Sequence, residues 1–226
     1  MDTNTQDLYT PRLIFLGVLS LTSLAGYINT VFLSLLLLPV SHITGTVSRF
    51  SLDLFRRDVG DGVQILLAIL GFFLGSFVTG LIIGGGQLKF GRRYGLILML
   101  EGTVLAGSSF ALKQFSYPAL FLAAFACGLQ NAMASGYQGM IVRTTHLTGS
   151  LTDFGVLLGR ALRGTKVDSW QLMLLSLALL SFLASGVLGA YASSLFGFAS
   201  LWLASGFCFL LGLAYYLWRY RVSLGA

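Results

Sequence analysis

Long apolar stretches separated by short polar segments form the main pattern of this chain. Six of these stretches are long enough to predict helices that cross a lipid bilayer, since one span needs about 20 apolar residues. The predicted spans cover residues 13–38, 63–83, 94–112, 118–142, 170–191 and 198–218. The pattern therefore predicts an all-α integral membrane protein with about six transmembrane helices, organised as a single membrane domain over residues 1–226.

Two shorter segments carry charged residues among their apolar ones. Between residues 47 and 57, Val47, Phe50 and Leu54 recur at helical spacing, with Arg49 and Asp53 among them. This pattern is typical of an amphipathic helix, and a second such segment ends near residue 166. We expect both short extra helices to lie at the membrane surface, because the charges of Arg49 and Asp53 would be costly at the middle of a bilayer.

Each short helix is preceded by a His-x-Thr-Gly motif, and the two motifs are 104 positions apart. They are His42-Ile43-Thr44-Gly45 and His146-Leu147-Thr148-Gly149, and seven of the nineteen aligned positions that begin with them are identical. Such internal similarity predicts two repeats, one over residues 13–113 and the other over 117–219. Because three spans per repeat is an odd number, the second repeat would be inverted relative to the first.

Composition and charge agree with a membrane protein. Charged residues make up 10% of the chain, against roughly 25% in soluble domains. The net charge of +6 does not indicate a nucleic-acid partner, since Lys and Arg gather at the inner surface of membrane proteins. With six spans, the face that holds both termini has ten Lys and Arg residues and the other has four. Both termini are therefore predicted in the cytoplasm, although eight crossing elements would give a similar bias.

The two cysteines, Cys127 and Cys208, lie inside apolar stretches. Their spacing suits neither a metal site nor a disulfide framework, so we expect inert buried thiols, no metal and no cofactor. The sequence also lacks a His-Glu-x-x-His or Gly-x-Ser-x-Gly motif and a carboxylate pair inside the bilayer. We therefore expect that the protein is not an enzyme.

Polar groups in or beside the spans are the candidates for a solute or ion pathway. Glu101 is the sharpest of them, because a carboxylate well inside a span is rare and by default marks function. The histidines titrate near neutrality, and Thr-Gly after a span would break a helix at a transport site. The candidates are His42, Thr44, Gly45, Glu101, Asn131, His146, Thr148, Gly149 and Asp153.

Each candidate also has a structural interpretation. The two motifs would be interfacial turns in which Thr-Gly ends or caps a helix, with Thr148 as a helix cap. Glu101 would be a structural acid bonded to a neighbouring helix, since its counterpart in the second repeat is Ser205. Arg49 and Asp153 occupy equivalent positions with opposite charges, and they would either pair across the two repeats or be solvated separately.

One run of residues carries a resemblance to a known family. It consists of Cys127-Gly128-Leu129-Gln130-Asn131-Ala132, followed by residues 143–153 with the second motif. This run resembles the signature of the YoaK-like family of bacterial multi-spanning membrane proteins, a domain of unknown function, and the resemblance extends over nearly the whole chain. The chain departs from the family at Asn29, where an acidic residue is usual, and at Thr46, where an asparagine is usual. The resemblance implies a bacterial inner-membrane protein and no established substrate.

These observations lead to an expected function. We expect a small-solute or ion transporter or channel with a site between the two repeats, and the alternative is a non-transporting membrane scaffold or assembly subunit. The expected partners are the lipid bilayer and an unknown small solute or ion, with no nucleic acid. Glycine-rich faces on the second and fifth spans would also allow a homodimer. A water-accessible path to Thr44, Thr148 or Glu101 would favour transport.

Overall fold

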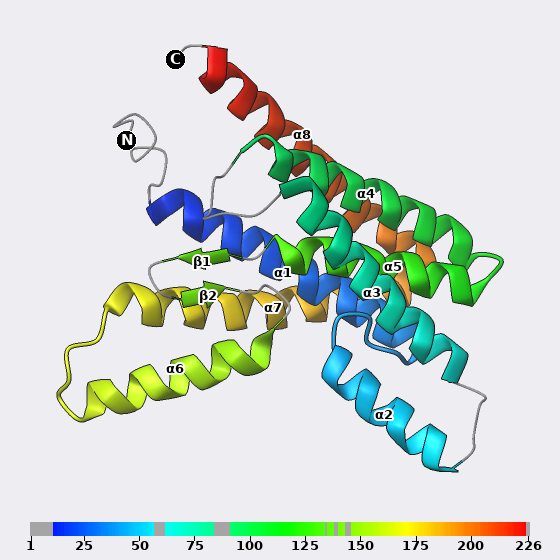
Figure 1. Cartoon of the computed structure of the whole chain (residues 1–226), viewed down its shortest axis with the longest axis horizontal. Helices are drawn as coiled ribbons and strands as arrows, with labels where there is room; N and C mark the ends of the chain where they lie inside the picture. Colours follow the sequence, from blue (N-terminus) through cyan, green and yellow to red (C-terminus); the bar gives the residue numbers. More distant parts are fainter. Residues whose placement is uncertain are drawn as a thin grey trace.

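The computed structural model describes residues 11–56, 62–83, 91–133, 135–137, 140–142 and 146–224. This part of the chain is almost entirely helical (Figure 1). Its α-helices are α1 (Pro11–Leu36), α2 (Ile43–Arg56), α3 (Gly62–Ile83), α4 (Arg93–Leu112), α5 (Ser116–Ala132), α6 (Leu147–Leu162), α7 (Ser169–Phe196) and α8 (Leu201–Leu224). A 3-10 helix, η2 (Gly197–Ser200), joins α7 to α8, and a hairpin of β1 (Ser135–Tyr137) and β2 (Met140–Val142) follows α5.

Four stretches of the described residues are long and apolar enough to cross a membrane. They are Phe15–Leu36, Gly62–Ile83, Arg93–Leu112 and Ser169–Val222. The last contains both α7 and α8, because η2 follows α7 directly and leads into α8 without a gap. Gly197, at the end of α7, adopts a positive φ of 55°. Helices of this length and composition identify the chain as a multi-pass membrane protein.

Four of the long helices pack in two parallel pairs, α3 with α5 and α1 with α7. In the pair α3 and α5, Gly71 lies against Phe121, and Gly75, one turn later, lies against Phe125. Contacts that advance together along both helices mean that the helices run in the same direction. The absence of a side chain at these glycines lets the two backbones approach closely.

The pair α1 and α7 is parallel in the same way. The ring of Phe15 contacts the ring of Trp170 near the start of both helices, with 5.3 Å between the ring centroids. Further along, Gly26 of α1 lies against the carbonyl group of Phe182 of α7. Close contact again depends on glycine, since any Cβ atom at Gly26 would overlap the α7 backbone.

The pair α4 and α8 runs antiparallel. Gly95, near the start of α4, lies against Gly212 at the middle of α8, whereas Gly102 lies against Ser205 near the start of α8. The Ser205 hydroxyl donates a hydrogen bond of 2.7 Å to the carbonyl oxygen of Gly102. Beyond that, Ser109 donates to the carbonyl oxygen of Phe198 at 3.0 Å. These directions matter for the membrane topology.

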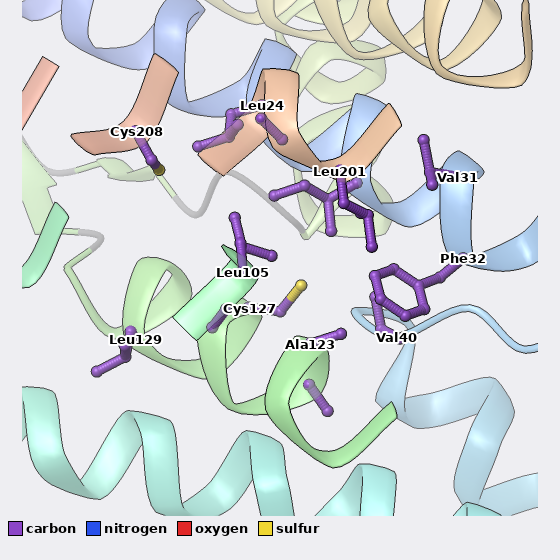
Figure 2. Close-up of a cluster of buried hydrophobic side chains, with 14 of the residues drawn as sticks. Leu24, Val31, Phe32, Val40, Leu105, Ala123, Cys127, Leu129, Leu201 and Cys208 are labelled. Carbon is purple, nitrogen blue, oxygen red and sulfur yellow. The ribbon is translucent and has the colours of Figure 1, made fainter. Parts of the chain in front are cut away.

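The core lies where α1, α4, α5 and α8 meet. Figure 2 shows Leu24 of α1, Leu105 of α4, Cys127 of α5 and Leu201 of α8 around one centre, and all four are buried. Many large apolar side chains are exposed on the outside of the bundle, such as Phe73 of α3 with 61% of its surface exposed. An apolar exterior of this kind suits a lipid environment rather than water.

Most predicted spans agree with the helices within a few residues, but the fourth was predicted too long. The prediction extended it to residue 142, whereas α5 ends at Ala132 and the chain then forms the β1–β2 hairpin. Gly136, which pairs with Ile141 in this hairpin, is a poor helix former. The prediction of an all-α fold therefore holds for the described residues except at this hairpin.

The predicted extra helices, α2 and α6, both exist as short helices beside the bundle. Figure 1 shows them well apart, with α2 next to α3 and α6 next to α7. Among the glycines of the second and fifth spans, Gly71 and Gly75 face α5 and Gly186 and Gly189 face α1, whereas Gly80 has no atom near its missing side chain.

Candidate functional site

The two His-x-Thr-Gly motifs have the same local structure. A Cβ atom at Gly45 would lie 2.8 Å from His42 Nδ1, and a Cβ atom at Gly149 would lie 2.9 Å from His146 Nδ1. In both copies, therefore, the imidazole ring folds over the glycine three residues later. Only glycine leaves room for the ring in this position.

The hydrogen bonds at the start of the two short helices also correspond. The Thr46 backbone N–H and hydroxyl both donate to the carbonyl oxygen of His42, at 3.1 and 3.0 Å. Ser150 makes the same two contacts with His146, at 3.3 and 3.5 Å. Two positions further along each helix, the Ser48 hydroxyl donates to the carbonyl oxygen of Thr44 at 3.0 Å, and the Thr152 hydroxyl donates to the carbonyl oxygen of Thr148 at 2.8 Å.

The motifs do not break a helix, and this expectation was wrong. Because α2 begins at Ile43 and α6 at Leu147, Thr-Gly lies in the first turn of each helix. Thr148 is not a cap either: His146 holds the cap position of α6, and its side chain makes no capping bond. The bonds from Thr46 and Ser150 are compatible with continuous helix, so nothing forces the backbone to open there.

The structure does not bring the motif residues together. His42, Thr44, His146, Thr148 and Asp153 are all exposed. Figure 1 shows α2 and α6 at opposite ends of the bundle, so the described residues of the two motifs lie well apart in this conformation. For the same reason the structure does not pair Asp153 of α6 with its opposite charge on α2.

Glu101 lies at the centre of the bundle on α4. Its exposed surface is 0%, and neither oxygen of its carboxyl group has a hydrogen-bond partner. The next residue, Gly102, is held tightly against α8 by the bond from Ser205. Glu101 therefore lies in an apolar interior, next to a side chain of the neighbouring helix α8.

Two thiols lie near this carboxyl group. The Cys208 side chain of α8 lies beside Glu101, although not in hydrogen-bonding geometry, and Cys127 of α5 belongs to the same buried core. Both cysteines are free and buried, as expected. Within the described residues, His, Cys, Asp and Glu side chains form no group of three that could hold a metal ion.

Two more buried side-chain oxygens among the described residues lack hydrogen-bond partners. Gln130 of α5 donates from Nε2 to the carbonyl oxygen of Leu21 at 2.5 Å, but its Oε1 atom accepts nothing. Thr22, the residue after Leu21, has a buried hydroxyl oxygen without a partner. Both side chains are at least 98% buried. The sequence indicated Asn131 instead, which is only half-buried.

A different amide, that of Asn29, has a structural role. Its Oδ1 atom accepts hydrogen bonds from the Ser41 hydroxyl at 2.8 Å and from the Ser41 backbone N–H at 3.3 Å. These bonds tie the segment between α1 and α2 back onto α1. Asn29 thereby positions the first motif, and its amide oxygen is already occupied by protein donors.

Comparison with known proteins identifies a family whose function is unknown. A family model described as "Protein of unknown function (DUF1275)" matches residues 17–214. No curated protein and no solved structure matches the chain. The matched range begins within α1 and ends within α8, so it includes the whole central site. Since the family description assigns no activity, function must be argued from the residues themselves.

Proposed function

This chain belongs to the DUF1275 family, and we propose that it transports a small solute or ion across a membrane with Glu101 as the ion-coupling group. The observation that carries this proposal is the complete burial of a carboxyl group without any hydrogen-bond partner. An ionised carboxylate in such surroundings is very costly unless it is paired. Glu101 in this conformation therefore holds either a proton or a cation, and it would release its ion when water reaches it.

The directions of the helices favour six membrane crossings. If α2 and α6 stay at the surface, α4 and α8 cross in opposite directions, whereas eight crossings would make them parallel. The contacts from Gly95 to Gly212 and from Gly102 to Ser205 are antiparallel. The parallel pairs α1–α7 and α3–α5 also fit six crossings, with both termini on one side.

The same contacts support inverted repeats. Shifting α1 and α3 by 104 positions moves them onto α5 and α7, so the pairs α1–α7 and α3–α5 are equivalent under exchange of the two halves. The shared geometry of the His-Gly contacts and the hydroxyl bonds adds local support. Because each pair combines helices from both halves, the units that would move during transport are the pairs α1–α7 and α3–α5 around α4 and α8.

We place the protein in the inner membrane of a bacterium with both termini in the cytoplasm. The support is the excess of ten Lys and Arg residues over four in the sequence and the tendency of basic residues to stay on the cytoplasmic side. The described members of the larger group include Arg92 and Arg93 at the start of α4, and Arg219 and Arg221 near the end of α8.

A non-transporting scaffold is the second candidate, and the close helix contacts favour it. Gly75 and Gly128 bring the backbones of α3 and α5 together so closely that no side chain fits at either position. Helices fixed this tightly suit a static assembly subunit. We infer no catalytic role, because the sequence contains no His-Glu-x-x-His or Gly-x-Ser-x-Gly motif and no carboxylate pair inside a span.

Reconstituted protein would test the transport proposal. Liposomes with an internal pH indicator would be challenged with a membrane potential and with amino acids, monocarboxylates, sugars and nucleosides in turn. We expect wild-type protein to produce ion movement with at least one class of solute. The Glu101→Gln variant keeps the shape of the side chain but cannot carry a charge, so it should lose this movement.

The control variant is Thr103→Val, which changes an exposed residue two positions away on the same helix. The Thr103 hydroxyl bonds only to the carbonyl oxygen of Met99 in its own helix, at 2.8 Å, so transport should persist. Equal flux in wild type and Glu101→Gln would refute the role of the carboxyl group. No flux from folded wild-type protein under any gradient would support the scaffold instead.

A further inference from the structure

We infer that the turn between α6 and α7 binds the headgroups of anionic phospholipids, while the end of α6 contacts their acyl chains. Three exposed basic residues at this turn carry the inference: Arg160, Arg163 and Lys166. The lipid site goes beyond the proposed transport and does not depend on it, because it uses no residue of the central site.

The turn lies at the end of a membrane span. The helix α7 starts at Ser169, shortly after the turn, and belongs to a stretch that is long and apolar enough to cross a membrane. A turn at the end of such a helix reaches the level of the lipid headgroups. Trp170, in the first turn of α7, agrees with this level, because tryptophan is enriched at membrane–water interfaces. Figure 1 shows the turn at the left edge of the molecule.

Backbone hydrogen bonds fix the shape of this turn. The Thr165 N–H donates to the carbonyl oxygen of Arg160 at 3.1 Å, and the Gly164 N–H donates to that of Ala161 at 3.0 Å. Gly164 adopts a positive φ of 76°. This combination is the Schellman motif, which ends many helices. The basic residues therefore project from a turn that is already ordered, which lowers the entropy lost when a headgroup binds.

The charges of the basic residues are available to a ligand. Among the described residues, none is recorded as a hydrogen-bond or ion-pair partner of their side chains. Asp168, the nearest acidic residue in the sequence, instead caps α7, where its Oδ1 atom accepts a hydrogen bond from the Trp170 backbone N–H at 3.0 Å. Each Lys or Arg near an anionic membrane surface strengthens binding about fivefold, so the three together favour an anionic lipid.

The equivalent segment of the first half lacks this charge. A shift of 104 positions aligns residues 160–166 with residues 56–62. The segment 160–166 contains three basic residues and no acidic one, whereas 56–62 contains two arginines and two aspartates. Their net charges are therefore +3 and 0. In the proposed inverted arrangement, the excess positive charge faces one leaflet only, as recognition of an anionic lipid in that leaflet requires.

Exposed leucines beside the charges select a lipid rather than a soluble anion. Leu158 and Leu162 are 44% and 82% exposed, and their spacing of four residues places them on one side of α6. Arg160 and Arg163, three residues apart, share a different side. A basic side and an apolar side on one helix are typical of helices that bind at the lipid interface. A phospholipid supplies both a phosphate and acyl chains, whereas free phosphate would leave the leucines exposed.

Quenching of Trp170 fluorescence by brominated lipids would test the site. The full chain with Trp202→Phe and Trp218→Phe keeps Trp170 as its single tryptophan. It would be reconstituted in mixtures of phosphatidylcholine and phosphatidylglycerol in which one lipid or the other is brominated. We expect phosphatidylglycerol to be enriched beside Trp170 by at least about fivefold over phosphatidylcholine. Both leaflets have the same composition in these vesicles, so the result does not depend on the orientation of the protein.

Two arginines at equivalent positions of the two halves make the test specific. Arg160→Gln should lower the preference for phosphatidylglycerol about fivefold, and Arg160→Lys should retain it. Arg56, the counterpart of Arg160, is also exposed but lies on α2. Arg56→Gln should therefore leave the preference beside Trp170 unchanged.

Three outcomes would overturn the inference. The first is equal quenching of the single-tryptophan protein by the two brominated lipids, or an equal preference in Arg160→Gln and Arg56→Gln. The second is a preference that disappears in sodium phosphate but persists in NaCl of equal ionic strength, which would indicate a site for free phosphate. The third is the absence of quenching by either lipid, which would indicate that protein covers the turn. A failure of transport would leave the lipid site intact.

Discussion

Gly75→Ala should separate α3 from α5, and the structure allows the size of the effect to be worked out. A Cβ atom at Gly75 would lie 2.0 Å from the carbonyl oxygen of Phe125 and 2.9 Å from the backbone nitrogen of Leu129. Backbone atoms cannot rotate away as a side chain can. Ordinary contacts between heavy atoms are about 3.5 Å or longer, so the two helices would have to move apart by roughly 1.5 Å.

The expected loss of stability has two sources. Overpacking of this kind costs about 1–3 kcal/mol. Separation also breaks the bonds from Ser76 to Gly128 at 3.2 Å and from Thr79 to Leu129 at 3.0 Å, and such interhelical bonds contribute about 0.6 kcal/mol each. Together these effects predict that Gly75→Ala lowers the free energy of unfolding by about 2–4 kcal/mol.

Gly80→Ala is the matched control, because Gly80 lies on the same helix with no atom near its missing side chain. Any gain in helix propensity from alanine is shared by both variants and cancels in the comparison. Unfolding would be followed by circular dichroism in mild detergent with increasing SDS. If the two variants unfolded at the same SDS fraction, the close contact between α3 and α5 would be refuted.

Two further predictions concern the short helix α6 and the start of α7. Gly149→Ala should keep or slightly raise the free energy of unfolding, by up to about 1 kcal/mol, because the new methyl group meets only the ring of His146, which can rotate away. The displaced ring should change its NMR shifts, and unchanged shifts would contradict the contact. Asp168→Ala should lower the free energy of unfolding by about 1 kcal/mol, because Asp168 Oδ1 accepts the hydrogen bond from the Trp170 backbone N–H at 3.0 Å. Unfolding in SDS would measure this loss, and Asp168→Asn should keep most of the stability.

Much of the helical pattern could be predicted because long apolar stretches have few alternatives in a membrane protein. The fourth span was predicted too long because Ile141 and Val142 continue the apolar pattern beyond the glycines, although they belong to a strand. The pairing of α1 with α7 could not be predicted, since a buried face does not identify its partner. Neither composition nor periodicity distinguishes parallel from antiparallel neighbours.

The central site could be predicted only in part. Glu101 was found because a carboxylate is conspicuous inside a span, whereas the sequence indicated Asn131 rather than the fully buried Gln130, since the pattern does not show which of two adjacent amides faces the interior. The helix break at Thr44-Gly45 was predicted wrongly because the same two residues suit either a break or the first turn of a helix. Only the three-dimensional contacts distinguish these cases.

The exchange of helices between the two halves has a consequence for how the protein is made. The main partner of α1 is α7, and the main partner of α3 is α5, so the first three helices are synthesised and inserted before either partner exists. Until the C-terminal half is inserted, the glycine-containing faces of α1 and α3 therefore have no partner helix in the bilayer. The N-terminal half reaches its final packing only after α5 and α7 have been inserted. Two fragments divided between α4 and α5 should consequently be unstable apart and assemble when they are produced together.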